Sequence, residues 1–125
     1  QKKYFKENKT MILVTGGVFQ HKLDFIYEKF LLTKNDVGTK IIYKFNHIVK
    51  NWIEENKNIE EETKRFIENN KDSIVVLDQV GCGIVPVDKK EEVYREYVGR
   101  AGCIIAENSE EVYNVVFGLG IKIKG

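Results

Sequence analysis

Apolar positions along the chain follow two alternating patterns, compact runs and helical stripes. The runs are short, nearly continuous and bounded by glycine or polar residues, as in strands buried on both faces of a parallel sheet. Strands are therefore predicted over residues 11–14, 41–43, 74–77 and 112–117. Between the runs, apolar residues recur at spacings of three and four, which predicts amphipathic helices. These stripes cover residues 23–32, 45–53, 59–67 and 89–98.

The order of the predicted elements indicates the fold class. Strands alternate with helices, which favours right-handed βαβ crossovers and a mostly parallel sheet. Residues 121–124 alternate apolar with basic side chains, as an edge strand does. Residues 101–108 fit either a helix or a strand, since Gly99 and Gly102 weaken both assignments. The pattern as a whole predicts an α/β fold.

Length and composition indicate one globular domain. The chain has 125 residues, of which 42% are hydrophobic and 31% are charged, so wholesale disorder is excluded. We expect a single α/β domain over residues 11–125, preceded by a polar, flexible extension over residues 1–10. A net charge of +1 argues against nucleic-acid binding, which needs a basic excess on one face. No apolar run is long enough to predict a membrane span.

The two cysteines, Cys82 and Cys103, are too few for a disulfide scaffold or a four-thiolate zinc site. No signal-peptide pattern opens the chain, so we expect a reducing cytoplasmic compartment. Cys103 is expected to be buried. Cys82 lies in a glycine-rich loop and has no evident base nearby in the sequence, so we interpret it as a small side chain rather than a nucleophile.

The first predicted strand leads into a glycine turn and then a helix, the arrangement of a phosphate-binding loop. In an open parallel sheet, ligands bind at the carboxyl ends of the strands. Thr15, Gly16 and Gly17 lie at such an end, with Lys22 at the start of the helix. Gly16 and Lys22 match the first glycine and the lysine of the motif G-x-x-x-x-G-K-[ST].

Two positions of this loop depart from the motif. His21 replaces the second glycine, which lets backbone amides approach the phosphates. Leu23 replaces the hydroxyl that binds magnesium, and leucine cannot coordinate a hard cation. The loop is therefore degenerate, and a strand-to-helix turn with a solvated Lys22 is the alternative interpretation.

Asp78 is the candidate metal ligand of the chain. It follows the apolar run of residues 74–77, as the acid of a Walker B strand follows its strand and holds magnesium. A buried strand that ends in a turn-favouring aspartate has the same pattern. Both interpretations are open on the sequence alone.

Several segments together resemble one enzyme family. Residues 11–17 resemble the opening of that family, and residues 79–86 are similar to its E-V-G-x-G-I-V-P segment. The resemblance continues through residues 94–99 and ends in residues 112–119, similar to the closing V-Y-x-V-V-x-G-L. On these segments the chain resembles the bifunctional adenosylcobinamide kinase/adenosylcobinamide-phosphate guanylyltransferases.

The resemblance implies a P-loop-type, three-layer α/β/α domain with a mostly parallel sheet, and a homotrimer. One family element is missing between Leu32 and Ile41. The implied ligands are ATP or GTP with Mg²⁺ and a corrinoid, because the family phosphorylates adenosylcobinamide and then transfers GMP onto the phosphate. The candidate nucleotide-binding residues are Thr15, Gly16, Gly17, Lys22, Gln79, Gly81 and Gly83.

The chain also departs from the family pattern. The family transfers GMP through a histidine in an H-x-x-x-R-P motif, which this sequence lacks, and neither His21 nor His47 has that context. Gln79 replaces the glutamate of E-V-G, and an amide cannot act as a base. Tyr43 or Lys44 stands where the family has the acid of its D-C-L-T segment.

Two hypotheses follow from these departures. The chain is a cobalamin-biosynthesis homologue with weak nucleotide binding and no guanylyl transfer, in which kinase activity is an open question. Alternatively, it is a non-catalytic nucleotide- or corrinoid-binding subunit of the same fold. A dinucleotide-binding module is the weakest alternative, because Gly16 and Gly17 lack the G-x-G-x-x-G spacing.

Overall fold

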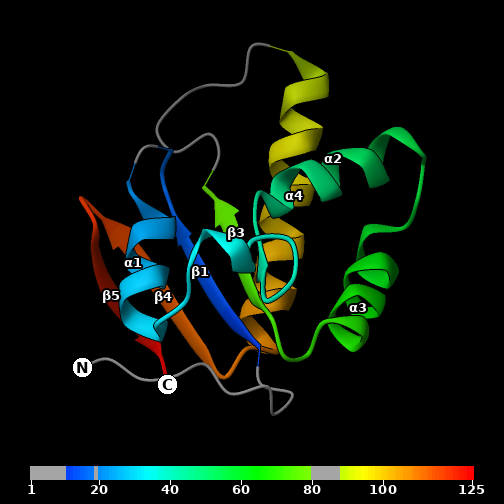
Figure 1. Cartoon of the computed structure of the whole chain (residues 1–125). Coiled ribbons are helices and arrows are strands. Elements are labelled where there is room, and N and C mark those ends of the chain that lie inside the picture. Colours follow the sequence, from blue (N-terminus) through cyan, green and yellow to red (C-terminus); the bar gives the residue numbers. More distant parts are fainter. Residues whose placement is uncertain (1–10, 19, 80–87) are drawn as a thin grey trace.

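The computed structural model describes residues 11–18, 20–79 and 88–125. These residues form a five-stranded sheet in the order β2-β3-β1-β4-β5 (Figure 1). In chain order the elements are β1 (Ile12–Gly16), α1 (Lys22–Phe30), the 3-10 helix η1 (Lys34–Asp36), β2 (Ile41–Ile42), α2 (Phe45–Glu54), α3 (Ile59–Asn69), β3 (Ile74–Asp78), α4 (Lys89–Glu107), β4 (Glu111–Val116) and β5 (Leu119–Lys124). The extension predicted for residues 1–10 and the loop with Gly81, Cys82 and Gly83 lie outside the described residues.

The sheet is mostly parallel, as the sequence predicts. β1 lies at its centre and pairs in parallel with both β3 and β4, and β2 pairs in parallel with β3. β5 runs antiparallel to β4 at one edge. The predicted edge strand is thus confirmed, and it begins earlier than expected, at Leu119.

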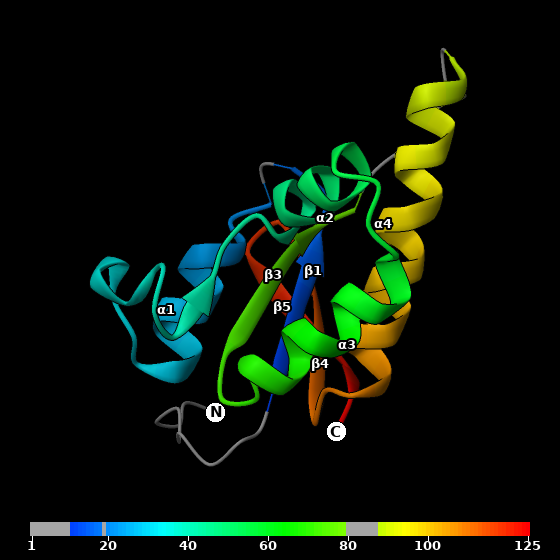
Figure 2. The same ribbon diagram turned by 90° about the vertical axis from the view of Figure 1, so that its right-hand side faces the viewer.

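Helices cover both faces of the sheet, which gives the expected three-layer α/β/α arrangement (Figure 2). Alternate residues of a strand point to opposite faces. Ile12 and Val14 of β1 therefore pack with Ile26 and Phe30 of α1 on one face. Leu13 lies in a separate cluster on the other face, where α2, α3 and α4 pack.

α4 is a single helix of 19 residues, so the ambiguous segment 101–108 is helical up to Glu107. Gly102 lies within it and touches the sheet, because a Cβ there would be 2.8 Å from Cδ2 of Leu77. Tertiary contact therefore outweighs the low helix propensity of glycine. The expected burial of Cys103 is wrong: its neighbours Ala101 and Gly102 occupy the buried side of the helix, and Cys103 is exposed.

Two element ends differ from the predictions because residues adopt positive φ angles. The first helix ends at Phe30, since Leu31 is left-handed with φ 56° and its N–H donates to the carbonyl of Tyr27. The strand predicted over residues 112–117 ends at Val116, because Phe117 has φ 51° and begins the turn into β5. In the part of the chain that is described, no helix is both long and apolar enough to cross a membrane.

Candidate functional site

The carboxyl ends of β1 and β3 lie side by side next to the start of α1. Gly16, the last residue of β1, is in register with Asp78, the last residue of β3. The N–H of Gln79 donates to the carbonyl oxygen of Gly16 at 2.9 Å. The structure therefore brings together the candidate residues at the ends of two strands that are distant in sequence.

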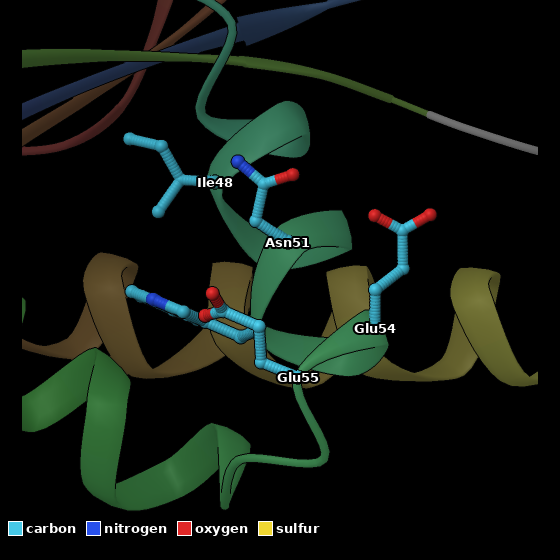
Figure 3. Close-up of a pocket in the computed structure, with 5 residues that line it drawn as sticks. Ile48, Asn51, Glu54 and Glu55 are labelled. Carbon is cyan, nitrogen blue, oxygen red and sulfur yellow. The ribbon is translucent and has the colours of Figure 1, made fainter.

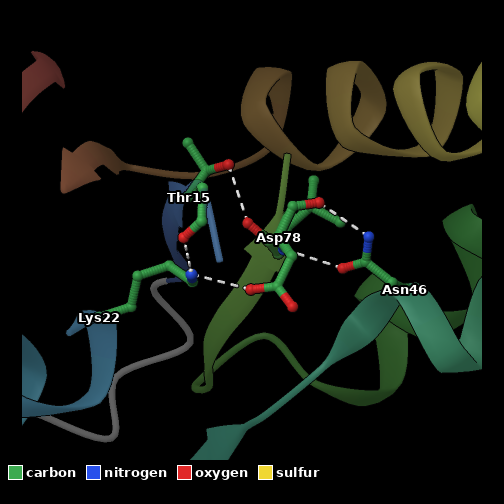
Figure 4. A network of polar contacts seen from close by, with 6 residues as sticks. Thr15, Lys22, Asn46 and Asp78 are labelled. Atoms are coloured by element: carbon green, nitrogen blue, oxygen red, sulfur yellow. Dashed lines mark hydrogen bonds and ion pairs between the residues drawn. The ribbon is translucent and has the colours of Figure 1, made fainter. Parts of the chain in front are cut away.

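Lys22 is the cationic centre of this group. It is the first residue of α1, and its side chain is 6% exposed. Its Nζ lies 2.8 Å from Oδ1 of Asp78 and donates to the carbonyl oxygen of Gly17 at 2.6 Å (Figure 4). The alternative interpretation, in which Lys22 is solvated, is therefore wrong. Alternate side chains of β3 face α1, and Asp78 is the last of them, so its carboxylate can pair with the ammonium.

The loop between β1 and α1 shows why the motif has glycine at two places. Gly16 has φ 157°, and a Cβ there would be 2.6 Å from the carbonyl oxygen of Val115. His21 precedes α1 in the left-handed region, with φ 61° and ψ 43°. Glycine adopts that conformation freely, whereas another residue is strained there. The ring of His21 lies 3.2 Å from the carboxylate of Asp24.

Gln20 fastens this loop to the turn between β4 and β5. Its Oε1 accepts from the N–H of Phe117 at 2.6 Å, and its carbonyl oxygen accepts from the N–H of Gly118 at 3.0 Å. No sequence pattern predicts this role of Gln20, since its partners lie almost a whole chain length away.

Asn46 is a second residue that sequence reasoning missed. Its Nδ2 donates to the carbonyl oxygen of Asp78 at 2.7 Å, and its Oδ1 accepts from the N–H of Asp78 at 2.8 Å (Figure 4). It is 3% exposed, between the buried residues Phe45 and Val49 of α2. A buried amide within the apolar stripe of residues 45–53 was the signal that could have found it.

Thr15 lies apart from the ammonium of Lys22. Its hydroxyl donates to the carbonyl oxygen of Leu77 at 2.9 Å. Like Leu13, Thr15 faces the α4 side of the sheet, where both line a groove of about 530 Å³ together with Asp78 and Gln79. The structure brings five of the candidate residues together at the carboxyl ends of β1 and β3: Gly16, Gly17, Lys22, Asp78 and Gln79. Gly81 and Gly83 lie outside the described residues.

Comparison with known proteins shows that most of the chain matches one protein family. The model of the family named cobinamide kinase / cobinamide phosphate guanyltransferase matches residues 28–123, which is most of the chain. The chain belongs to this family. The match includes Asn46 and Asp78, and it begins after Lys22, so the loop over residues 15–22 is placed by the structure alone.

Two curated members of this cobinamide kinase / guanyltransferase family are similar to part of the chain. Each is a bifunctional adenosylcobalamin biosynthesis protein CobU, one from Salmonella typhimurium and one from Escherichia coli. Both are 39% identical over 51 residues, which cover 41% of this chain and 28% of the relative. The similar segment thus spans less than a third of either relative.

The metal-binding capacity of this family member is limited in the described residues. They contain no group of three or more His, Cys, Asp or Glu side chains that could hold a metal ion. Asp78 contributes one carboxylate, paired with Lys22. Magnesium keeps several waters and is commonly held by one or two carboxylates plus substrate phosphates. Asp78 is therefore the described carboxylate that could hold an ion carried by a nucleotide.

Two hollows on α2 lie away from the ammonium of Lys22. One, of about 320 Å³, is lined by Ile48, Asn51, Trp52, Glu54 and Glu55 (Figure 3). Another, of about 500 Å³, lies between α2 and the start of α4 and includes the exposed His47. His47 is thus a surface residue of the helix, and it does not join Lys22 and Asp78.

Proposed function

We propose that the chain is a nucleotide-binding homologue in cobalamin (adenosylcobinamide) biosynthesis, and that it binds phosphates beside Lys22. The observation that carries the proposal is the ion pair of the buried Lys22 with the half-buried Asp78 at the N-terminal end of α1. A helix N-terminus and a cation at the carboxyl ends of parallel strands attract phosphate groups. ATP or GTP is the expected ligand, since the chain belongs to a kinase and guanyltransferase family.

The contacts of Lys22 suggest how a nucleotide would enter. A phosphate oxygen would take the place of the Gly17 carbonyl as acceptor for Nζ, and would compete with Asp78 for the ammonium. Asp78 would then be free to bind an Mg²⁺ ion carried by the nucleotide. Because a buried pair must open and Leu23 offers no hydroxyl, we expect weak binding, about millimolar or about −4 kcal/mol.

Guanylyl transfer is not part of the proposal. A covalent enzyme–GMP intermediate needs a nucleophile in the site, and the sequence has no H-x-x-x-R-P motif. His21 and His47 are both exposed and lie in other contexts. Incubation with labelled GTP should leave no acid-labile label on either histidine. A stable label on either histidine would contradict this prediction and would indicate that the chain does transfer guanylyl groups.

A non-catalytic nucleotide- or corrinoid-binding subunit is the second candidate. Gln79 favours it, because its amide stands where the family has a glutamate and its backbone N–H is bonded to Gly16. An amide cannot take a proton from a substrate hydroxyl. This candidate shares the phosphate site of the first and differs from it in having no turnover.

Calorimetry with ATP and GTP, with and without Mg²⁺, tests the phosphate site. We expect weak binding that changes little with Mg²⁺ and is lost in Lys22→Ala. The matched control is Lys64→Ala, which removes an exposed lysine of α3. Low-micromolar, Mg²⁺-dependent binding would favour an active kinase. No heat at several millimolar nucleotide would overturn the proposal, and cobinamide is then the ligand to titrate.

We also propose that the chain forms a homo-oligomer, through the face of the β4–β5 hairpin. Leu119, Ile121 and Ile123 alternate along β5 and are 71%, 56% and 62% exposed. Phe117, in the turn before them, is 82% exposed. The described part of the chain leaves this stripe uncovered. Exposed contiguous apolar surface of this kind commonly marks a protein–protein contact.

A further inference from the structure

β3 extends beyond the strand that pairs with it on one side. β2 pairs with β3 only at Ile41 and Ile42, which are in register with Ile74 and Val75. The N–H of Ile74 donates to the carbonyl oxygen of Lys40 on the β2 side. In a parallel ladder the backbone groups of every second residue point to the same edge. The N–H and C=O of Asp78 therefore point to the place that a longer β2 would occupy.

The side chain of Asn46 occupies that place. Its amide donates to the carbonyl oxygen of Asp78 at 2.7 Å and accepts from the N–H of Asp78 at 2.8 Å. In a longer β2, backbone groups of two different residues would satisfy this N–H and C=O, because the bonds of a parallel ladder are staggered. A primary amide carries both a donor and an acceptor, so one side chain can take the place of both backbone groups.

The helix that carries Asn46 is fixed in the core. Phe45 and Val49, on either side of it in α2, are both fully buried. Lys44 turns the chain into the helix with a left-handed backbone, φ 56°. Asn46 is thus held by a rigid element, as a residue that fixes another group in place must be.

We propose that Asn46 is a positioning residue that acts through the backbone of Asp78. By completing the edge of β3, it directs the Asp78 carboxylate toward Lys22, 2.8 Å from Nζ. Asn46 thereby sets how readily that ammonium is released to a phosphate. The inference rests on the proposed phosphate site for its functional meaning, whereas the geometry it describes can be tested without a nucleotide.

The rate at which Lys22 reacts with an amine reagent tests the positioning. A short pulse of acetylation under native conditions, read by mass spectrometry, compares Lys22 with the exposed Lys64 in the same molecule. In the wild-type protein Lys22 should react slowly, because it is buried and paired. Asn46→Ala should raise its rate by about an order of magnitude, as the loss of a charge-assisted contact implies. Asp78→Asn sets the upper limit, and Asn46→Ala/Asp78→Asn should be no faster than Asp78→Asn alone.

Two control variants separate positioning from general destabilisation. Val49→Ala removes buried methyl groups from the same helix, so it lowers stability without touching Asp78. Asn51→Ala removes an exposed asparagine of α2. Both should leave the rate of Lys22 unchanged. If Asn46→Ala does not fold, the milder Asn46→Ser is used, since its hydroxyl cannot reach both backbone groups. A wild-type rate in the Asn46 variant, or equal acceleration in Val49→Ala, would overturn the proposal.

Titration with tripolyphosphate separates this inference from the proposed function. Accelerated labelling of Lys22 in Asn46→Ala, with no tripolyphosphate binding by any variant, supports positioning and overturns the phosphate site. Binding of tripolyphosphate by the wild-type protein, with labelling of Lys22 unchanged in Asn46→Ala, supports the site and overturns positioning. If Asn46→Ala changes both the labelling rate of Lys22 and the affinity for tripolyphosphate, the latter by fivefold or more in either direction, the result supports the positioning role and the phosphate site together.

Discussion

Lys22 is the residue in which charge, burial and proposed function coincide. Its ammonium is almost enclosed and contacts Asp78, which is itself 22% exposed. Removing one partner of a buried pair leaves the other charge without compensation. We expect Lys22→Ala to lower the free energy of unfolding by about 2–3 kcal/mol.

Denaturant titration of Lys22→Ala beside Lys64→Ala measures this cost. The exposed Lys64 should change stability by no more than about 0.5 kcal/mol. Asp78→Asn in the Lys22→Ala background should recover part of the loss, because the unpaired carboxylate is gone. Equal stability of the two lysine variants would show that Lys22 is solvated after all.

Tyr113 predicts a pH dependence at the alkaline end. Burial, together with a hydrogen bond from its hydroxyl to Glu111 at 2.8 Å and the charge of that carboxylate, raises the pKa of Tyr113 above its ordinary value. In the unfolded chain the phenol ionises near pH 10, whereas in the folded chain it keeps its proton. The unfolded state then binds fewer protons, so the free energy of unfolding falls as the pH rises above about 10.

Denaturant titration of the wild-type protein and of Tyr113→Phe between pH 8 and pH 11 isolates the contribution of this residue to the free energy of unfolding. The wild-type protein should lose more stability over that interval than the variant does. Parallel curves would show that Tyr113 titrates alike in the folded and unfolded chain.

At the scale of elements, the turn of the β4–β5 hairpin has a residue that does not suit its backbone conformation. Its two turn residues, Phe117 and Gly118, have φ angles of 51° and 77°, and a two-residue turn with positive φ at both positions favours Asn-Gly. Phe117 is 82% exposed and gains little from packing. We expect Phe117→Asn to stabilise the fold by about 0.5–1 kcal/mol.

Leu119→Asn is the matched comparison for the turn variant. Leu119 is also exposed, and it lies in a strand, where asparagine is disfavoured. Leu119→Asn should therefore not raise the free energy of unfolding. Thermal unfolding of both variants at low protein concentration keeps association out of the measurement. A loss of stability in Phe117→Asn would mean that the aromatic ring packs in a way the hairpin does not show.

The elements themselves follow mostly from local pattern. Apolar runs and stripes identified the strands and helices that the structure contains, because each is buried on predictable faces. The sequence does not decide the segment after Gly99, since two glycines lower its helix propensity and only the contact of Gly102 with Leu77 compensates for that loss. Helix and strand ends at Leu31 and Phe117 depend on backbone angles that no apolar pattern records.

At the scale of the whole molecule, association should follow from the exposed face of β5. The apolar runs over residues 112–117 and around Trp52 predict more apolar surface than one thin sheet can cover. Val112 and Trp52 are buried, at 5% and 9% exposure, whereas Val116 and Phe117, at 37% and 82%, lie exposed beside the stripe on β5. We expect an oligomer at concentrations of tens of micromolar, the range of about 6–7 kcal/mol interfaces.

Light scattering after size exclusion measures the mass of the assembly. Ile121→Lys places a charge in the middle of the stripe and should dissociate the oligomer, whereas Asn51→Ala, at an exposed position of α2, should leave its mass unchanged. A monomeric wild-type protein at these concentrations would contradict the proposed oligomer.

The sequence by itself determined the α/β class and the mostly parallel sheet, and it places Gly16 and Asp78 at the carboxyl ends of predicted strands. Periodicity is a local property, and in a parallel sheet the carboxyl ends of strands meet at one edge. Only the tertiary structure decided that Lys22 is buried, that Asn46 completes the edge of β3 and that β5 stays exposed. Each of these depends on which distant segment covers a given side chain, and that information is absent from the spacing of residues along the chain.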